Sequence, residues 1–220
     1  MYLKPLPSHL QSKYPEWVAL YVLRYCWSDE YSELFISDRP DLQSKRGIIG
    51  IEVTEAISER QAKIRSNFTN FIHHKNYPDI RELSKSIIEN NGGTVDDISV
   101  LYPQKTAEDE QAVFLDAIQK KVRKLPSYQD RCFKKMGLFI WYDEPLVPTM
   151  DDYAELFERA LNIQETTYDC LWLCHSFAIL SFDNKTKKLG TRIIPREDFD
   201  TIKYNARIAL EEQRSILKKE

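Results

Sequence analysis

The most informative stretch of this chain is GIIGIEVT, residues 47–54. Its apolar run predicts a buried strand, although a carboxylate, Glu52, lies inside it. Burying an ionised carboxylate is costly unless the group is paired or holds a metal ion. Because side chains alternate along a strand, Glu52 and Thr54 are predicted on one face, with Ile51 and Val53 on the other. The alternative is a carboxylate facing solvent from a one-sided sheet, and the flanking isoleucines argue against a strand so exposed to water.

A second acidic residue, Asp41, follows Pro40 and is separated from Glu52 by ten residues. The middle of this interval, SKRG at 44–47, suits a hairpin turn. Such a hairpin would place Asp41 beside Glu52 on neighbouring strands, and two converging carboxylates make an oxygen-rich site for Mg²⁺ or Mn²⁺. The alternative for Asp41 is an ordinary acidic residue at a turn or at the end of a strand.

Pro40-Asp41 together with Glu52 resembles the metal-binding motif of the PD-(D/E)xK nuclease superfamily, which has the restriction-endonuclease-like fold. The resemblance implies that Asp41 and Glu52 bind a metal ion, with the carbonyl oxygen of Val53 near the same ion. It also implies a lysine two residues after the glutamate, which helps to activate water. This chain has Thr54 there, and a hydroxyl cannot replace a positive charge, although it could hold a water or orient a neighbour. The resemblance therefore covers the metal pair and fails at the third residue.

Two residues are candidates for the missing function, because the superfamily is known for moving its lysine to other elements. Lys121 interrupts the apolar stripe of a predicted helix over about 107–125, where an unpaired ammonium is disfavoured. A nearby carboxylate–metal site would explain it, and snorkelling from the border of the stripe is the alternative. Gln61, in a predicted helix over about 55–74, could orient water or make only a local hydrogen bond. By the same resemblance, Glu16 could add a third carboxylate from the first helix.

The order of the predicted elements indicates an α/β fold with a mixed central sheet flanked by helices. The same order is what the restriction-endonuclease-like resemblance implies. We expect one nuclease-like domain over 1–220, with an irregular arm at 1–13 and a C-terminal helix at 196–220. The remaining expected helices are 15–28, 79–90 and 151–162, and the strands are 33–36, a segment after Asp41, 47–54, 137–142, 170–174, 177–182 and 191–194.

Composition bounds the class of protein. Of the 220 residues, 42% are hydrophobic and 30% charged, which is typical of a soluble globular chain. No apolar run is long enough to span a bilayer and the start lacks a signal-peptide core, so we expect a cytoplasmic protein. The four cysteines include no CxxC pair, and buried thiols are expected rather than zinc ligands.

The net charge of −3 gives no positive support for nucleic-acid binding, although a local groove can be basic on a neutral protein. Our leading hypothesis is a metal-dependent phosphodiesterase that acts on DNA or RNA with Mg²⁺ or Mn²⁺. The rival hypothesis is a nuclease fold with a degenerate site, which binds nucleic acid or a protein partner. A homo-oligomer also stays open, as does an unrelated α/β protein in which Asp41 and Glu52 never meet.

Overall fold

The computed structural model describes residues 6–104, 106–128, 133–142, 150–163 and 167–217. The chain forms two compact units. Residues 13–56 and 111–220 form what we call the sheet unit, and residues 1–12 and 57–110 form the helical unit. Each unit is described by itself, and the expectation of one nuclease-like domain stays a prediction.

The sheet unit contains a seven-stranded mixed sheet in the order β1-β2-β3-β6-β7-β8-β9. Its three central strands, β3, β6 and β7, are parallel, whereas the neighbours on both sides pair antiparallel. The predicted α/β class with a mixed sheet is therefore confirmed. The bounds are β1 Leu34–Ile36, β2 Leu42–Ser44, β3 Ile49–Glu55, β6 Lys135–Tyr142, β7 Cys170–His175, β8 Ala178–Asp183 and β9 Lys188–Ile193.

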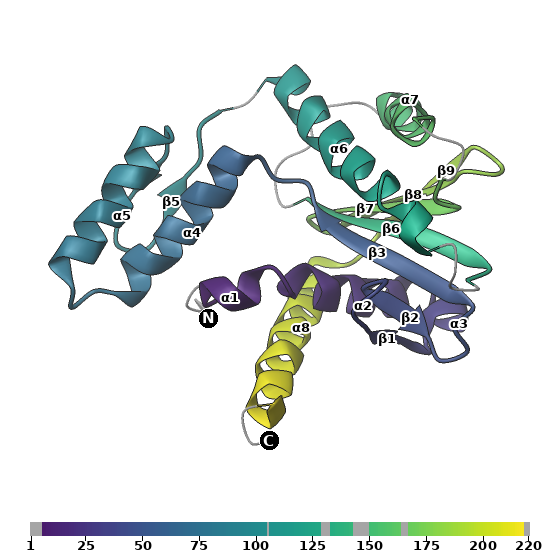
Figure 1. Cartoon of the computed structure of the whole chain (residues 1–220), viewed down its shortest axis with the longest axis horizontal. Coiled ribbons are helices and arrows are strands. Elements are labelled where there is room, and N and C mark those ends of the chain that lie inside the picture. Colours follow the sequence, from purple (N-terminus) through teal and green to yellow (C-terminus); the bar gives the residue numbers. More distant parts are fainter. Residues whose placement is uncertain (1–5, 105, 129–132, 143–149, 164–166, 218–220) are drawn as a thin grey trace. The chain divides into compact units, whose positions relative to one another are not determined.

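Helices cover both faces of this sheet, with α2 and α8 on one face and α6 and α7 on the other (Figure 1). The alternation of the strands divides the apolar side chains between two cores. Ile51 and Val53 of β3 belong to the core with α2 and α8. Leu138 and Leu171, from the next two strands, belong to the core with α6 and α7. The bounds are α2 Tyr14–Cys26, α3 Ser28–Tyr31, α6 Ala107–Val122, η1 Leu125–Tyr128, α7 Met150–Leu161 and α8 Arg196–Leu217.

The helical unit is built on the helix pair α4 (Glu59–His73) and α5 (Pro78–Asn90). The short helix α1 (Ser8–Gln11) joins it through a hydrogen bond of 2.6 Å from Gln11 Nε2 to Thr69 Oγ1. Two short strands, β4 (Thr94–Val95) and β5 (Val100–Leu101), form a separate antiparallel pair.

Several boundaries differ from the sequence-based expectations, among them the starts of β6 and β9, which lie at Lys135 and Lys188 rather than at 137 and 191. The helix expected from residue 55 begins at Glu59, because β3 continues to Glu55 and a capping box at Ser58 starts α4. The helix expected to end at 125 ends at Val122, and the 3-10 turn η1 follows it. The arm expected to be irregular over 1–13 contains α1, and residues 1–5 of it lie outside the described part. Among the described residues, none of the helices combines the length and the hydropathy that a membrane-spanning segment requires.

Candidate functional site

Glu52 is buried in the middle of β3, with only 3% of the residue exposed. In the parallel register it pairs with Leu138 of β6, so its side chain lies on the face that α6 and α7 cover. The strand is held there because Ile51 and Val53 pack into the core on the opposite face. A carboxylate fixed in this position requires partners with positive charge or donor hydrogens.

Asp41 lies directly before β2, and its side chain contacts the backbone of β3. Its Oδ2 atom accepts a hydrogen bond of 2.7 Å from the backbone N–H of Val53, the residue after Glu52. The β2–β3 hairpin thus places the two acidic residues side by side on antiparallel neighbours. Burial raises the pKa of the Asp41 carboxyl, the Lys121 ammonium lowers it, and the negative charge of Glu52 raises it further.

Lys121, from the last turns of α6, joins the two carboxylates. Its Nζ atom lies 2.5 Å from Glu52 Oε2 and 3.3 Å from Asp41 Oδ2. The lysine side chain is 16% exposed, so the ion pair is mostly buried but still reaches solvent. The backbone of α6 is held at this point by Tyr168, whose hydroxyl donates to the Lys121 carbonyl oxygen at 3.1 Å. Lys121 thus supplies a positive charge to the pair that the motif position, Thr54, does not supply.

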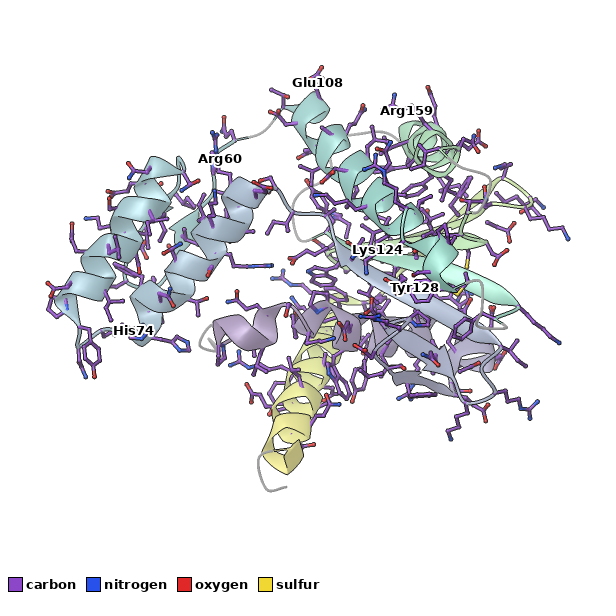
Figure 2. All side chains as sticks on the ribbon, viewed as in Figure 1. Arg60, His74, Glu108, Lys124, Tyr128 and Arg159 are labelled. Atoms are coloured by element: carbon purple, nitrogen blue, oxygen red, sulfur yellow. The ribbon has the colours of Figure 1, made fainter. Side chains whose placement is uncertain are left out.

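Tyr128 is the hydrogen-bond partner of the second carboxylate oxygen of Glu52. Its hydroxyl donates to Glu52 Oε1 at 2.5 Å, and the residue is 8% exposed. Tyr128 ends η1, the 3-10 turn that follows α6, and Figure 2 shows it just beyond Lys124. Burial and the hydrogen bond to Glu52 raise the pKa of this phenol, so it remains a donor at neutral pH. Tyr128 was not among the residues predicted from the sequence, and its place in a 3-10 turn beyond the end of α6 gives no helical spacing that would link it to Lys121.

Glu16, on α2, adds a third buried carboxyl to the surroundings of Asp41. One of its oxygens accepts from Lys13 Nζ at 3.0 Å, while Oε2 is buried with no hydrogen-bond partner among the described residues. Burial raises the pKa of Glu16 to about 7, the Lys13 hydrogen bond lowers it, and the negative charge of Asp41 raises it. Even so, the described part of the chain contains no group of three or more His, Cys, Asp or Glu residues placed to hold one metal ion.

We expect Glu16→Gln to stabilise the protein at pH 8 and to leave its stability unchanged at pH 4. The folded-state pKa of about 7 lies above the ordinary value of 4.5. The stability that the protonated Glu16 carboxyl contributes is therefore fully present below about pH 4.5, and it is lost as the pH rises through about 7. A pKa unit corresponds to about 1.4 kcal/mol, and screening by solvent reduces the effect for a carboxyl that is only partly buried, so the gain in unfolding free energy at pH 8 is about 2–3 kcal/mol. Urea unfolding at both pH values, with the exposed Glu33→Gln as control, measures it, and an equal change at both values contradicts it.

Gln61 and Thr54 are placed differently from the three clustered residues. Gln61 lies in the helical unit, where its Oε1 accepts from Ser58 N at 3.2 Å and from Ser58 Oγ at 2.9 Å in the capping box of α4. Its role in orienting water stays a prediction. Thr54 is partly buried on β3, and alternation places it on the same face as Glu52. Val53 reaches the site through its N–H, and the predicted role of its carbonyl oxygen as a metal ligand likewise stays a prediction.

The donor atoms of this cluster fit a hard divalent cation in their chemistry. Asp41 Oδ2 and Glu52 Oε2 both lie within reach of one cationic atom, Lys121 Nζ. Mg²⁺ is commonly held by one or two carboxylates together with waters and substrate phosphates, so two protein carboxylates suffice. Comparisons of the chain with protein-family models, with curated proteins and with solved structures found no match. The chemistry of the site is therefore argued from its own residues.

Proposed function

We propose that the protein is a metal-dependent phosphodiesterase of the nuclease type that acts on nucleic acid. The observation that carries the proposal is the position of Lys121, whose ammonium lies between the carboxylates of Asp41 and Glu52. The sequence resemblance requires a metal pair and a lysine, and the lysine was missing at Thr54. A lysine from α6 that reaches the same two carboxylates supports the idea that the charge is supplied from another element.

The arrangement of the sheet unit also supports the proposal. A helix, α2, precedes three antiparallel strands, and two further strands then extend the sheet in parallel with β3. This is the order that the sequence resemblance implied for a restriction-endonuclease-like fold. We therefore include that fold in the proposal.

In the proposed reaction Asp41 and Glu52 hold Mg²⁺ or Mn²⁺. When bound, such an ion polarises the scissile phosphate and lowers the pKa of an attacking water. The Lys121 ammonium places a positive charge where negative charge develops on the phosphate oxygens. The hydrogen bond from the Val53 N–H fixes the orientation of the Asp41 carboxylate before a metal ion or substrate binds.

Two further cations support a phosphate-bearing substrate. Lys13 lies close enough to Asp41 for the two charges to interact, and it pairs with Glu16. The positive charge of Arg39 lies close enough to Tyr128 to lower the pKa of its phenol, and the Arg39 side chain is 71% exposed. Together with Lys121 they give the site three cations, and each of these also pairs with carboxylates: Lys13 with Glu16, Arg39 with Asp38, and Lys121 with Asp41 and Glu52. Lysine and arginine side chains are the usual partners of phosphate oxygens in a nucleic-acid backbone, so these cations offer contacts to such a substrate.

A second candidate function is a binding module of the same fold without catalysis. The observation that favours it is the satisfaction of the acidic pair within the protein. Both oxygens of Glu52 have donors, from Lys121 and Tyr128, and Asp41 Oδ2 accepts from Val53 and Lys121. In this candidate Lys121 is a permanent structural partner, and the site binds nucleic acid or a protein without a metal ion.

Metal binding and cleavage by the wild-type protein separate the two candidates. We expect isothermal titration with Mn²⁺ to give saturable binding that strengthens from pH 5.5 to pH 7.5, because Asp41, whose pKa is raised, must lose its proton and because the nearby Glu16, with a pKa of about 7, gains negative charge over this range. We also expect cleavage of plasmid DNA or of single-stranded RNA with Mg²⁺ or Mn²⁺, and its loss with EDTA. Absence of Mn²⁺ binding at pH 7.5 contradicts the enzyme and favours the module.

A further inference from the structure

Tyr128 and Lys121 hold Glu52 from two successive elements, the end of α6 and the 3-10 turn η1 that begins three residues after it. Lys121 Nζ donates to Glu52 Oε2 at 2.5 Å, and the Tyr128 hydroxyl donates to Glu52 Oε1 at 2.5 Å. The two contacts differ in what a cation would do to them. A divalent ion competes with the Lys121 ammonium for Oε2, because both are positive. The same ion has no charge conflict with the phenol, which is neutral while its proton is in place.

The hydroxyl of Tyr128 is fixed as a donor by its surroundings. Its ring is buried in the core beneath α6 and α7, beside Leu125. Its hydroxyl lies 2.5 Å from Oε1 of Glu52, and because a carboxylate oxygen can only accept, the phenol is the donor. A hydrogen bond to a charged acceptor is about twice as strong as one between neutral groups. Oε1 of Glu52 is therefore engaged in a bond that a ligand must break before using that oxygen.

We propose that Tyr128 makes the site selective for Mg²⁺ and Mn²⁺ over Ca²⁺ by leaving Glu52 a single oxygen for an ion. This inference rests on the proposed function and assigns Tyr128 as a positioning residue. Ca²⁺ takes six to eight oxygens, often with bidentate carboxylates, whereas Mg²⁺ takes about six, commonly one from each carboxylate. A glutamate whose second oxygen is held by a buried phenol suits the smaller ion and lacks an oxygen that the larger ion needs. Asp41 adds to the effect, because its Oδ2 is partly engaged by Val53 N–H.

The experiment measures Mn²⁺ and Ca²⁺ affinities by calorimetry in wild type, Tyr128→Phe and Tyr153→Phe, so the readout is binding rather than turnover. Tyr128→Phe keeps the ring and removes the hydroxyl. Tyr153→Phe is the matched control, because Tyr153 is a buried tyrosine of the same core that packs against Phe114 and Phe157. We expect wild type and control to bind Mn²⁺ at least about tenfold more tightly than Ca²⁺. We expect Tyr128→Phe to shift the ratio of Ca²⁺ to Mn²⁺ affinity by about tenfold or more towards Ca²⁺, because the freed Oε1 of Glu52 can then serve as a second ligand to the larger ion.

The outcomes distinguish a failure of this inference from a failure of the proposed function. An unchanged ratio of Mn²⁺ to Ca²⁺ affinity in Tyr128→Phe overturns the role of Tyr128 and leaves the metal site standing. Equal affinities for the two ions in the wild-type protein overturn it without the variant, which covers the case in which Tyr128→Phe does not fold. Absence of Mn²⁺ binding in the wild type overturns the metal site and the inference with it.

Discussion

Neither Glu52→Gln nor Asp41→Asn should support metal-dependent cleavage, with rates at least about a thousandfold below wild type. An ion that stabilises a transition state is worth several kcal/mol, and each ~1.4 kcal/mol is a factor of ten in rate. Both substitutions keep the size of the side chain and remove its charge. Asn at 41 can still accept from Val53 N–H, and Gln at 52 can still accept from Tyr128. The loss should therefore come from the charge of the ligand, and Mn²⁺ binding measured by calorimetry should disappear in parallel.

Two exposed acidic residues provide the controls for this prediction. Asp38 lies three residues before Asp41 with its side chain 92% exposed, and Asp116 lies on α6 with its side chain 58% exposed. Asp116→Asn removes the same charge without touching the pair, so we expect a wild-type rate and wild-type Mn²⁺ affinity. Asp38→Asn, which removes the partner of Arg39, is the control for Mn²⁺ affinity alone. Circular dichroism and urea unfolding verify that each variant is folded. Full activity in a folded Glu52→Gln variant would remove the assignment of the metal pair.

Much of the sheet unit could be predicted from local pattern. The β2–β3 hairpin follows from the turn at 44–47 and the apolar run after it, and the structure pairs β2 with β3 as expected. The β8–β9 hairpin and α8 also follow from periodicity and turn residues. The start of α4 was wrong by four residues, although the signal was present. Ser58 and Gln61 have the spacing of a capping box, which marks a helix start after a strand that continues to Glu55.

The site was predicted less completely, because its contacts join segments far apart in the sequence. Lys121 could be proposed because a charge within an apolar stripe needs a partner. No local pattern connects Tyr128 to Glu52, since 76 residues separate them and the hydrogen bond depends on how α6 lies on β3. Gln61 was proposed from its place in a stripe, whereas its carbonyl oxygen serves the local cap at Ser58. The division into two units could not be predicted from local sequence either. Residues 1–12 belong to the same unit as residues 57–110, although residues 13–56 separate them in the sequence.

Lys121→Met should bind Mn²⁺ more tightly than wild type and yet cleave at least about a hundredfold more slowly, the usual cost of removing one electrostatic stabiliser. The ammonium contacts both Glu52 Oε2 and Asp41 Oδ2, so it competes with a cation for the same oxygens. Removing it relieves that competition and also removes the charge proposed to act on the phosphate. Lys120→Met is the matched control, because Lys120 is the adjacent residue, is 61% exposed and pairs with Asp116. We expect the control to keep wild-type affinity and rate.

The stability of the same variant separates enzyme from binding module. Without metal, Lys121→Met leaves two buried carboxylates with no ammonium between them, and breaking a buried ion pair costs about 3–5 kcal/mol. In the enzyme, Mn²⁺ replaces the lost positive charge, so millimolar Mn²⁺ should restore the melting temperature of the variant by more than it raises that of wild type. In a module whose lysine is purely structural, the variant stays destabilised at every Mn²⁺ concentration. Thermal melts of wild type, Lys121→Met and Lys120→Met with and without Mn²⁺ give the answer, and a melting temperature of Lys121→Met that does not respond to the ion contradicts the metal centre.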